Sequence, residues 1–292
     1  MLKVALLLGL LTSLLLLTGY AIGLYFGNPI GAIEVALIMA AIFNFISYFY
    51  SDKIVLAMTG ARIISPREYP RLHRIVERVA NMANIPKPKV AIINSTAPNA
   101  FATGRGPGKS VVAVTKGLLN LLDEEEIEAV IGHEIAHIRN RDVLIATIAA
   151  TIAGAISYLA YIGRWGLYFG SFSDRRRGGE SAAAALLAAI LAPIAALIIQ
   201  AAISRSREYL ADEIGAKITR KPLELASALR KIAEARNVGL TLNVNPATSH
   251  LWIINPLRAG AIAELFSTHP PIAVSYTHLR AHETEADLVC RL

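Results

Sequence analysis

Four long runs of apolar residues constrain the fold of this 292-residue chain more than any other feature of its sequence. Each run is close to the length of about 20 residues that an α-helix needs to cross a bilayer. The chain is 54% hydrophobic and yet 17% charged, and this combination indicates membrane spans joined to polar regions. We therefore expect about four transmembrane helices, at residues 4–26, 30–50, 143–163 and 181–204.

The basic residues predict which side of the membrane holds the polar regions. Residues 51–142 contain 13 Lys and Arg and residues 204–292 contain 11, whereas the short turn at 27–29 contains none. Because cytoplasmic segments are enriched in Lys and Arg, we expect a multi-pass protein of the cell membrane with both polar regions in the cytoplasm. Arg164 and Arg175–Arg177 lie between the third and fourth runs, so whether these two runs fully cross or form a shorter hairpin stays open.

The net charge and the cysteine content narrow the class of protein further. The net charge is +7, but the sequence contains no basic recognition helix and no RNA-binding motif, so we expect the lipid bilayer and not nucleic acid as a partner. The only cysteine is Cys290, so the fold does not depend on an intrachain disulfide.

The first polar region has the pattern of a mixed helix-and-strand domain. Residues 86–95 end in a β-rich run, and residues 110–122 read as a strand that continues into a helix. Asp123 and Glu126 are spaced as a capping box at the start of a further helix. Helical spacing within 65–85 predicts a capped amphipathic helix that has on one side Leu72, Ile75, Val76, Val79 and Met82.

The segment IGHEIAHIRNRD at 131–142 carries the residues best suited to chemistry. On a helix, His133 and His137 share one face with about 5–6 Å between their Cβ atoms, so both imidazoles can hold one metal ion. Glu134 follows His133 directly and can accept a proton from a water molecule at the metal. Gly132 and Ala136 are expected to leave room beside the metal, whereas the alternative is two surface histidines on an amphipathic helix.

A catalytic zinc site needs a third protein ligand. Positions 140 and 143 are Asn and Val, so no histidine follows in the metzincin arrangement. Glu208 and Asp212 lie four residues apart in a second predicted helix, which would let Glu208 bind the metal and Asp212 hydrogen-bond a ligand histidine. The spacing alone leaves open that both carboxylates are solvated and pair with Arg205 or Arg207.

Six motifs in a fixed order carry a resemblance to a known family. They are PNAFATG (98–104), VAVTKGLLNLL (112–122), HEIAHIRNRD (133–142), SREYLADEIGA (206–216), PATSHLWIINPL (246–257) and FSTHPP (266–271). With two pairs of apolar runs around them, they resemble the HtpX family of membrane zinc metalloproteases, relatives of the CAAX prenyl proteases. The resemblance covers residues 1 to about 272.

The resemblance implies a zinc metalloendopeptidase that binds one Zn²⁺ per chain through His133, His137 and Glu208, with Glu134 as the catalytic base. It also implies protein substrates, an active site that faces the cytoplasm, and a role in degrading damaged or misfolded membrane proteins as part of a stress response. The expected fold is a mainly α integral membrane protein with a zincin-like α+β metalloprotease domain. Two alternatives are a prenyl-protein processing protease and an inactive scaffold with a structural zinc, although an intact Glu134 disfavours the scaffold.

This organisation divides the chain into five parts. Two N-terminal transmembrane helices (1–50) are followed by the first protease region (51–142), two further apolar helices (143–203), the second protease region with the third ligand (204–272) and a tail (273–292). The tail departs from the family pattern and resembles a translated sequencing adaptor, so we expect it to be non-native. We therefore discount its His278 and His282, although they also lie four residues apart.

Two further positions are weaker candidates for the site. Asn99 to Thr103 are expected to form an edge strand, which could bind an extended substrate through Asn99. His269 could donate a hydrogen bond to the oxyanion of the transition state, whereas a histidine before two prolines is more often structural. His73 and His250 have no partner pattern and are assigned no chemistry.

Overall fold

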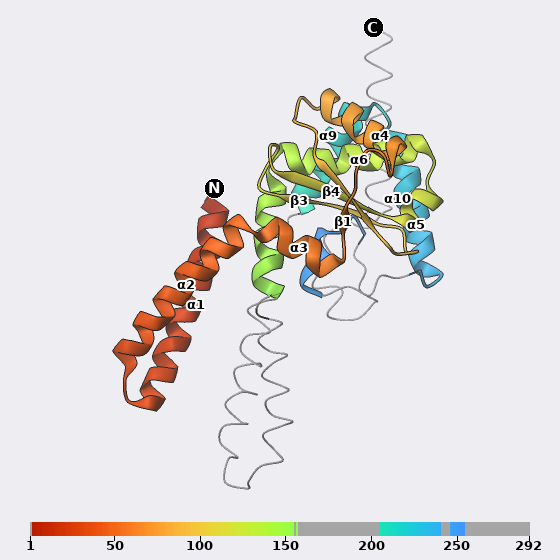
Figure 1. Ribbon diagram of the computed structural model, residues 1–292. Helices are drawn as coiled ribbons and strands as arrows, with labels where there is room; N and C mark the ends of the chain where they lie inside the picture. The colour runs from red at the N-terminus through yellow and green to blue at the C-terminus, as the bar shows by residue number, and fades with distance from the viewer. Residues whose placement is uncertain (1, 155, 157–204, 241–245, 255–292) are drawn as a thin grey trace.

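The computed structural model describes residues 2–154, 156, 205–240 and 246–254, and these residues are mostly helical. Figure 1 shows two parts, a long helical hairpin and a body in which helices surround a small sheet. The expected fourth apolar run and residues 255–292 lie outside the described residues.

The hairpin consists of α1 (Leu2–Phe26) and α2 (Pro29–Phe49). The Asn28 side chain caps α2 by accepting from the Gly31 amide, which explains the turn between the helices. Within the hairpin, the Asn44 amide donates to Thr12 Oγ1 at 2.8 Å. Gly19 contacts α2 so closely that a Cβ on it would lie 2.5 Å from the Ala36 methyl group. Small and polar residues therefore set the close packing of two otherwise apolar helices.

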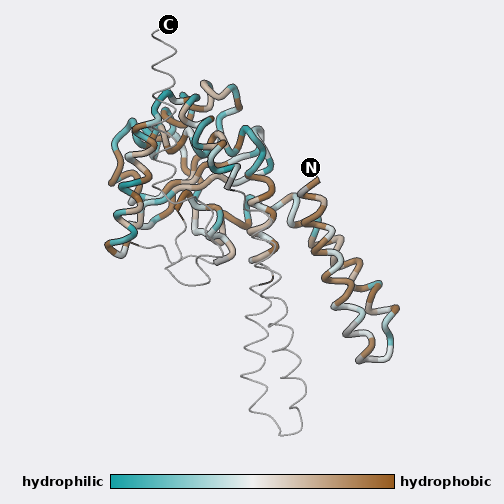
Figure 2. Tube along the Cα trace, turned by 180° about the vertical axis from the view of Figure 1, so that it is seen from behind, coloured by the Kyte–Doolittle hydropathy of each residue, from teal (hydrophilic) through white to brown (hydrophobic). Residues whose placement is uncertain are grey.

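Many large apolar side chains of the hairpin are exposed, and Figure 2 colours long stretches of both helices as hydrophobic. Among the described residues, α2 is the one helix that is both long and apolar enough to cross a membrane. Shorter apolar helices cover Val4–Tyr20 within α1 and Asp142–Gly154 at the start of the third predicted run. Leu7 and Leu11 of α1 pack with Ile148 and Ile152, so the apolar helices leave the body on one side.

The sheet has four strands in the order β1-β2-β4-β3, namely β1 (Arg62–Ile63), β2 (Lys89–Ile93), β4 (Ser110–Thr115) and β3 (Ala100–Gly104). Strands β2 and β4 are parallel, and the other two pairs are antiparallel. The edge strand expected at 99–103 is confirmed, because β3 lies at one end of this order.

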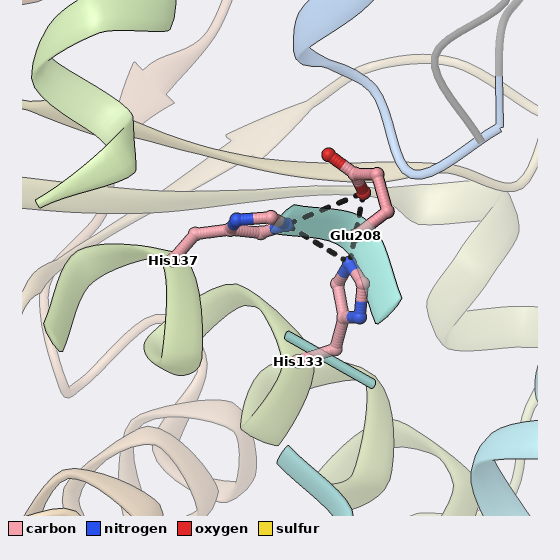
Figure 3. Close-up of side chains that lie close together, drawn as sticks. All are labelled: His133, His137 and Glu208. Atoms are coloured by element: carbon pink, nitrogen blue, oxygen red, sulfur yellow. Dashed lines mark hydrogen bonds and ion pairs between the residues drawn. The ribbon is translucent and has the colours of Figure 1, made fainter. Parts of the chain in front are cut away.

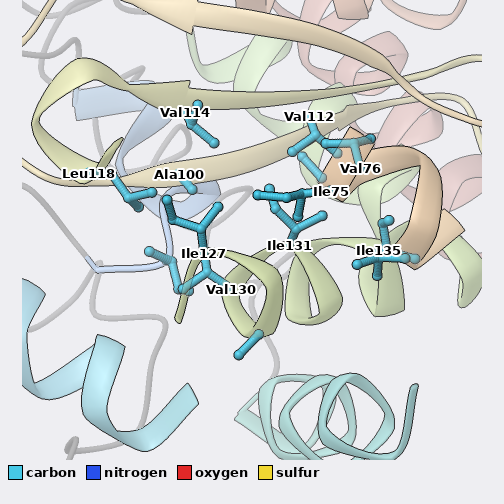
Figure 4. Close-up of a cluster of buried hydrophobic side chains, with 14 of the residues drawn as sticks. Ile75, Val76, Ala100, Val112, Val114, Leu118, Ile127, Val130, Ile131 and Ile135 are labelled. Carbon is cyan, nitrogen blue, oxygen red and sulfur yellow. The ribbon is translucent and has the colours of Figure 1, made fainter. Parts of the chain in front are cut away.

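Side chains alternate between two buried layers along β2 and β4. Val112 and Val114 face a core formed with α4 (Pro70–Met82) and α6 (Glu124–Arg139), which Figure 4 shows. Val111 and Ala113 face the opposite layer, where α3 (Ser51–Thr59) and the 3₁₀ helix η1 (Pro246–Leu251) cover the sheet. With both faces buried, strands β3 and β4 have no exposed residue and can support α6 rigidly.

Most of the predicted elements are confirmed. The capping box is formed by Asp123 and Glu126, and the strand and helix of 110–122 are β4 and α5 (Lys116–Leu121). The two polar helices beyond the apolar runs are α9 (Arg205–Thr219) and α10 (Pro222–Asn237).

Two predictions about the amphipathic helix, which is α4, are wrong. Leu72, Ile75, Val76 and Val79 are buried as predicted, but Met82 is 41% exposed because it lies in the last turn, beyond the edge of the sheet core. The helix also lacks the expected side-chain cap, since it starts with Pro70 after Tyr69. Proline at the first position has no amide hydrogen to satisfy, so this helix can begin without a cap.

Candidate metal centre

Helix α6 presents His133, Glu134 and His137, and ion pairs of its buried carboxylates fix its position in the body. The Glu128 carboxylate accepts two hydrogen bonds from Arg78 of α4, at 2.9 and 2.8 Å. On the side of α10, Glu126 accepts from Ser227 Oγ at 2.7 Å and lies 2.6 Å from Lys231 Nζ. Two buried carboxylates thus tie α6 to the helices on either side of it.

Helix α9 crosses α6 at two glycines. A Cβ on Gly132 would lie 2.5 Å from Thr219 Cγ2, and a Cβ on Gly215 would lie 2.8 Å from the backbone nitrogen of His133. The expectation that Gly132 leaves room beside the metal is therefore wrong, because Gly132 faces α9 and makes the close helix contact possible. This contact brings the carboxylates of α9 to the histidines of α6.

The structure brings His133, His137 and Glu208 together (Figure 3). The two Nε2 atoms of the histidines are 3.2 Å apart. Glu208 Oε2 lies 3.4 Å from His137 Nε2 and 3.8 Å from His133 Nε2. His133 is 1% exposed, and the side chains of His137 and Glu208 are 14% and 15% exposed, so the cluster is largely buried.

These spacings fit a zinc ion. Zinc binds histidine nitrogen and carboxylate oxygen at about 2.0–2.2 Å, and tetrahedral geometry then separates the ligand atoms by roughly 3.3 Å. The three observed separations of 3.2, 3.4 and 3.8 Å are close to that value. The donor set of two imidazoles and one carboxylate is also one that catalytic zinc sites use. The residues present therefore fit the metal.

A carboxylate lies behind each histidine, and the one behind His133 orients its ring. His133 Nδ1 donates to Asp212 Oδ1 at 2.9 Å, which leaves His133 Nε2 with a lone pair that faces the cluster. Asp212 is fully buried, and its Oδ2 has no hydrogen-bond partner among the described residues. Asp142 Oδ2 lies 3.7 Å from His137 Nδ1, and Asp142 Oδ1 lies 3.5 Å from Arg207. Asp142 thus lies on the corresponding side of His137, but as an ion-pair contact and not as a hydrogen bond.

The electrostatics of the cluster favour a cation. Burial disfavours the charged form of His137, but the carboxylates of Glu208 and Asp142 outweigh burial and hold the pKa of His137 well above its usual range. Glu134 is 2% exposed and adds to this negative potential at His137. The groups that favour a proton on the imidazole would equally favour a bound metal cation at the same place.

The other predicted positions divide into three groups. His269 lies outside the described residues. The Asn99 side chain is buried and paired with the backbone of Ile254, because Asn99 Nδ2 donates to the Ile254 carbonyl at 2.7 Å and Asn99 Oδ1 accepts from the Ile254 amide at 3.2 Å. This structural role was not anticipated, and a substrate contact of Asn99 stays a prediction. His73 and His250 donate to the carbonyl groups of Ile64 and Ala146.

The sequence analysis missed Asp142 and the Arg78–Glu128 pair. Asp142 ends the quoted segment, five residues after His137, and a search for carboxylates near each ligand histidine could have found it. The pairing of Arg78 with Glu128 joins residues 50 positions apart, so no local spacing indicates it.

Comparison with known proteins places these observations in a family. A model described as "Peptidase family M48" matches residues 66–283. Proteins named "Protease HtpX homolog" are similar over most of their length. That of Pyrococcus abyssi is 53% identical over 98% of this chain and 97% of its own, and that of Aquifex aeolicus is 55% identical over 86% and 83%.

Among solved structures, the crystal structure of S. mikatae Ste24p aligns with a TM-score of 0.48 and 19% identity. The alignment covers 91% of this chain, which spans 62% of the length of the Ste24p chain.

Proposed function

The chain belongs to peptidase family M48, and from this premise we propose that it is a membrane-bound, zinc-dependent endopeptidase. The observation that carries the proposal is the convergence of His133, His137 and Glu208 from two helices. Asp212 supports it, because a buried carboxylate on the far nitrogen of His133 is the usual arrangement for a metal-binding imidazole.

In this proposal His133 and His137 bind zinc through Nε2, and Glu208 binds through its carboxylate. When bound, zinc acts as a Lewis acid that polarises the substrate carbonyl and lowers the pKa of a water molecule. The protein holds these ligands in fixed positions. Glu126 and Glu128 of α6 bond to α10 and α4, and α9 packs against α6 at Gly215. Three fixed protein ligands would leave the fourth position of the zinc to water.

Glu134 is the proposed general base and general acid. It follows His133 on α6 and is almost fully buried, so its carboxylate has few rotamers available. It would accept a proton from the attacking water and then deliver that proton to the nitrogen of the leaving amine. No residue other than Glu134 is assigned this proton transfer.

The edge of β3 is the proposed binding surface for the main chain of the substrate. The outer edge is already used at Ala100, whose carbonyl accepts from Ile253, and at Gly104, whose amide donates to Thr147. Because outward groups alternate along a strand, the amide and carbonyl of Ala102 also point to this edge. An extended peptide could pair with Ala102 by strand addition.

We further propose that the protein is a multi-pass protein of the cell membrane in which α1 and α2 cross the bilayer. The exposed apolar surface of α2 and the close packing of α1 with α2 support this arrangement. The enrichment of Lys and Arg in the polar regions supports a cytoplasmic active site. The substrates would be damaged or misfolded membrane proteins, a role in quality control that fits a protease anchored beside them.

The decisive experiment is Glu134→Gln in the full chain purified in detergent. The variant removes the proton acceptor and no metal ligand, so casein cleavage should be lost while the zinc content stays at one per chain. Glu213→Gln is a matched control, because Glu213 lies on the exposed side of α9 and pairs with Lys217. Turnover at the wild-type rate in Glu134→Gln, after contaminating proteases are removed, would refute the mechanism.

A further inference from the structure

The turn between β3 and β4 and the first turn of α3 both carry basic residues beside the aromatic end of α2. Arg105 and Lys109 belong to the turn between β3 and β4, and Lys53 lies in the first turn of α3, directly after α2. We call Lys53, Arg105 and Lys109 the basic cluster. The basic cluster shares no residue with the metal centre formed by His133, His137 and Glu208.

Aromatic rings at the end of α2 hold two of these cations. The guanidinium carbon of Arg105 lies 5.4 Å from the ring centroid of Phe49, and Lys53 Nζ lies 5.1 Å from the ring centroid of Tyr50. The rings of Phe45 and Phe49 contact each other in a tilted arrangement with 4.6 Å between centroids. All three rings stay substantially exposed, so this is an aromatic surface and not part of the core.

The body of the protein fixes the turn in this position. Thr147 of the apolar helix Asp142–Gly154 accepts from the Gly104 amide at 3.2 Å and lies 3.1 Å from Thr103 Oγ1. The Arg105 amide donates to the Lys109 carbonyl at 2.9 Å, which closes the turn. The cluster therefore lies where α2 and a second apolar helix both leave the body, at the level expected for the membrane surface.

In the described part of the chain, no carboxylate lies within 4 Å of the charged groups of Lys53, Arg105 or Lys109. The one acid nearby in sequence is Asp52 in the first turn of α3, and it forms no ion pair with these residues. Arg105 Nε is buried and has no hydrogen-bond partner among the described residues, so this N–H donor is unsatisfied.

We propose that the basic cluster binds the phosphate of an anionic phospholipid headgroup. A phosphate oxygen can accept from Arg105 while Lys53 and Lys109 supply charge, and aromatic rings with apolar bodies suit the interface beside the acyl chains. The exposed apolar surface of α2 favours a lipid over free phosphate, because only a lipid also covers Phe45 and Phe49. The proposal rests on the membrane location proposed above and not on the peptidase chemistry.

The test is thermal melting of the purified full chain in neutral detergent with three additives, namely short-chain phosphatidylglycerol, short-chain phosphatidylcholine and inorganic phosphate. Phosphatidylglycerol should raise the melting temperature of the wild type in a saturable manner, and the other two additives should not. Arg105→Gln should weaken the apparent affinity roughly five-fold or more, as expected for the loss of one cation at a membrane surface. The apparent affinity of Arg105→Lys should lie between those of the wild type and Arg105→Gln, because lysine keeps the positive charge but lacks the planar guanidinium.

Arg74→Gln is the matched control, because Arg74 is an exposed arginine on α4 and has no described ion pair. It should respond to phosphatidylglycerol as the wild type does. The proposal would be overturned if Arg105→Gln and the wild type responded equally to phosphatidylglycerol, or if phosphatidylcholine raised the melting temperature as much as phosphatidylglycerol does. It would also be overturned if inorganic phosphate had the same effect as phosphatidylglycerol, because that result would show an anion site without lipid selectivity. Casein cleavage is measured separately in detergent, so a failure of the peptidase proposal would be seen there and would leave the lipid result unchanged.

Discussion

Gly215 of α9 lies against the backbone of His133, so closely that a Cβ at this position would be 2.8 Å from the His133 nitrogen and 2.9 Å from its Cα. The neighbour is backbone inside a buried helix and cannot move aside as a flexible side chain would. The absence of a side chain at Gly215 thus determines how near Glu208 and Asp212 come to the histidines.

Replacing Gly215 with alanine should separate α9 from α6. We expect a loss of about 1–3 kcal/mol of stability, the usual cost of overpacking, together with weaker zinc binding because Glu208 moves with α9. Melting temperature and zinc content report the two effects. Gly9→Ala is the control, since a Cβ there meets nothing within 4 Å, and it should not reduce stability. Normal zinc affinity in Gly215→Ala would show that the helix contact does not position the ligand.

The two carboxylates of α9 should differ in their effect on zinc. Glu208→Ala removes a proposed ligand and should abolish stoichiometric binding. Asp212→Ala removes only the acceptor for His133 Nδ1 and should weaken affinity about 10- to 100-fold, whereas Asp212→Asn should weaken it less because an amide oxygen can still accept. Competition with a calibrated chelator measures these constants. If Glu213→Ala lost zinc and Glu208→Ala did not, the ligand assignment would be wrong.

The ion pair between Arg78 and Glu128 should stabilise the body. Arg78→Met removes both hydrogen bonds to the buried Glu128 carboxylate, and Lys221 at 3.6 Å compensates only in part. We expect a loss of about 1–2 kcal/mol, at the lower end for a charged group because the Arg78 side chain is half exposed. Arg74→Met on the exposed side of the same helix should change stability little. A double variant with Glu128→Gln should recover part of the loss, and strictly additive effects would argue against direct coupling.

His73 should make stability depend on pH. Burial, with a smaller contribution from Lys87, lowers the pKa of His73 below its usual value. As pH falls below about 6.5, the unfolded chain takes up a proton that folded His73 resists, so the free energy of unfolding decreases. His73→Gln cannot titrate but can still donate to the Ile64 carbonyl. Its melting temperature should fall less than that of the wild type between about pH 7.5 and about pH 5.5, and equal losses would contradict the prediction.

Local patterns in the sequence were enough to predict most secondary structure. The capping box at Asp123, the helix over 222–237 and the strand that continues into α5 are determined by residues close together in the chain, so their spacing predicts them. The same holds for His133 and His137, because one helical turn places both on one face. The short helix α3 was not predicted, since Ser51–Thr59 was treated only as the start of a polar region.

Tertiary structure decided how these elements meet. In the sequence, Glu208 and Asp212 could equally have paired with arginines in solvent, because spacing within α9 says nothing about what faces it. The crossing at Gly132 and Gly215 places Glu208 beside both histidines and Asp212 behind His133. Likewise, the sequence predicts only that Asn99 begins an edge strand, whereas the structure pairs Asn99 with Ile254, 155 positions away. Helix spacing is a local property, whereas the approach of two helices depends on packing across the whole body, and only the folded chain determines that.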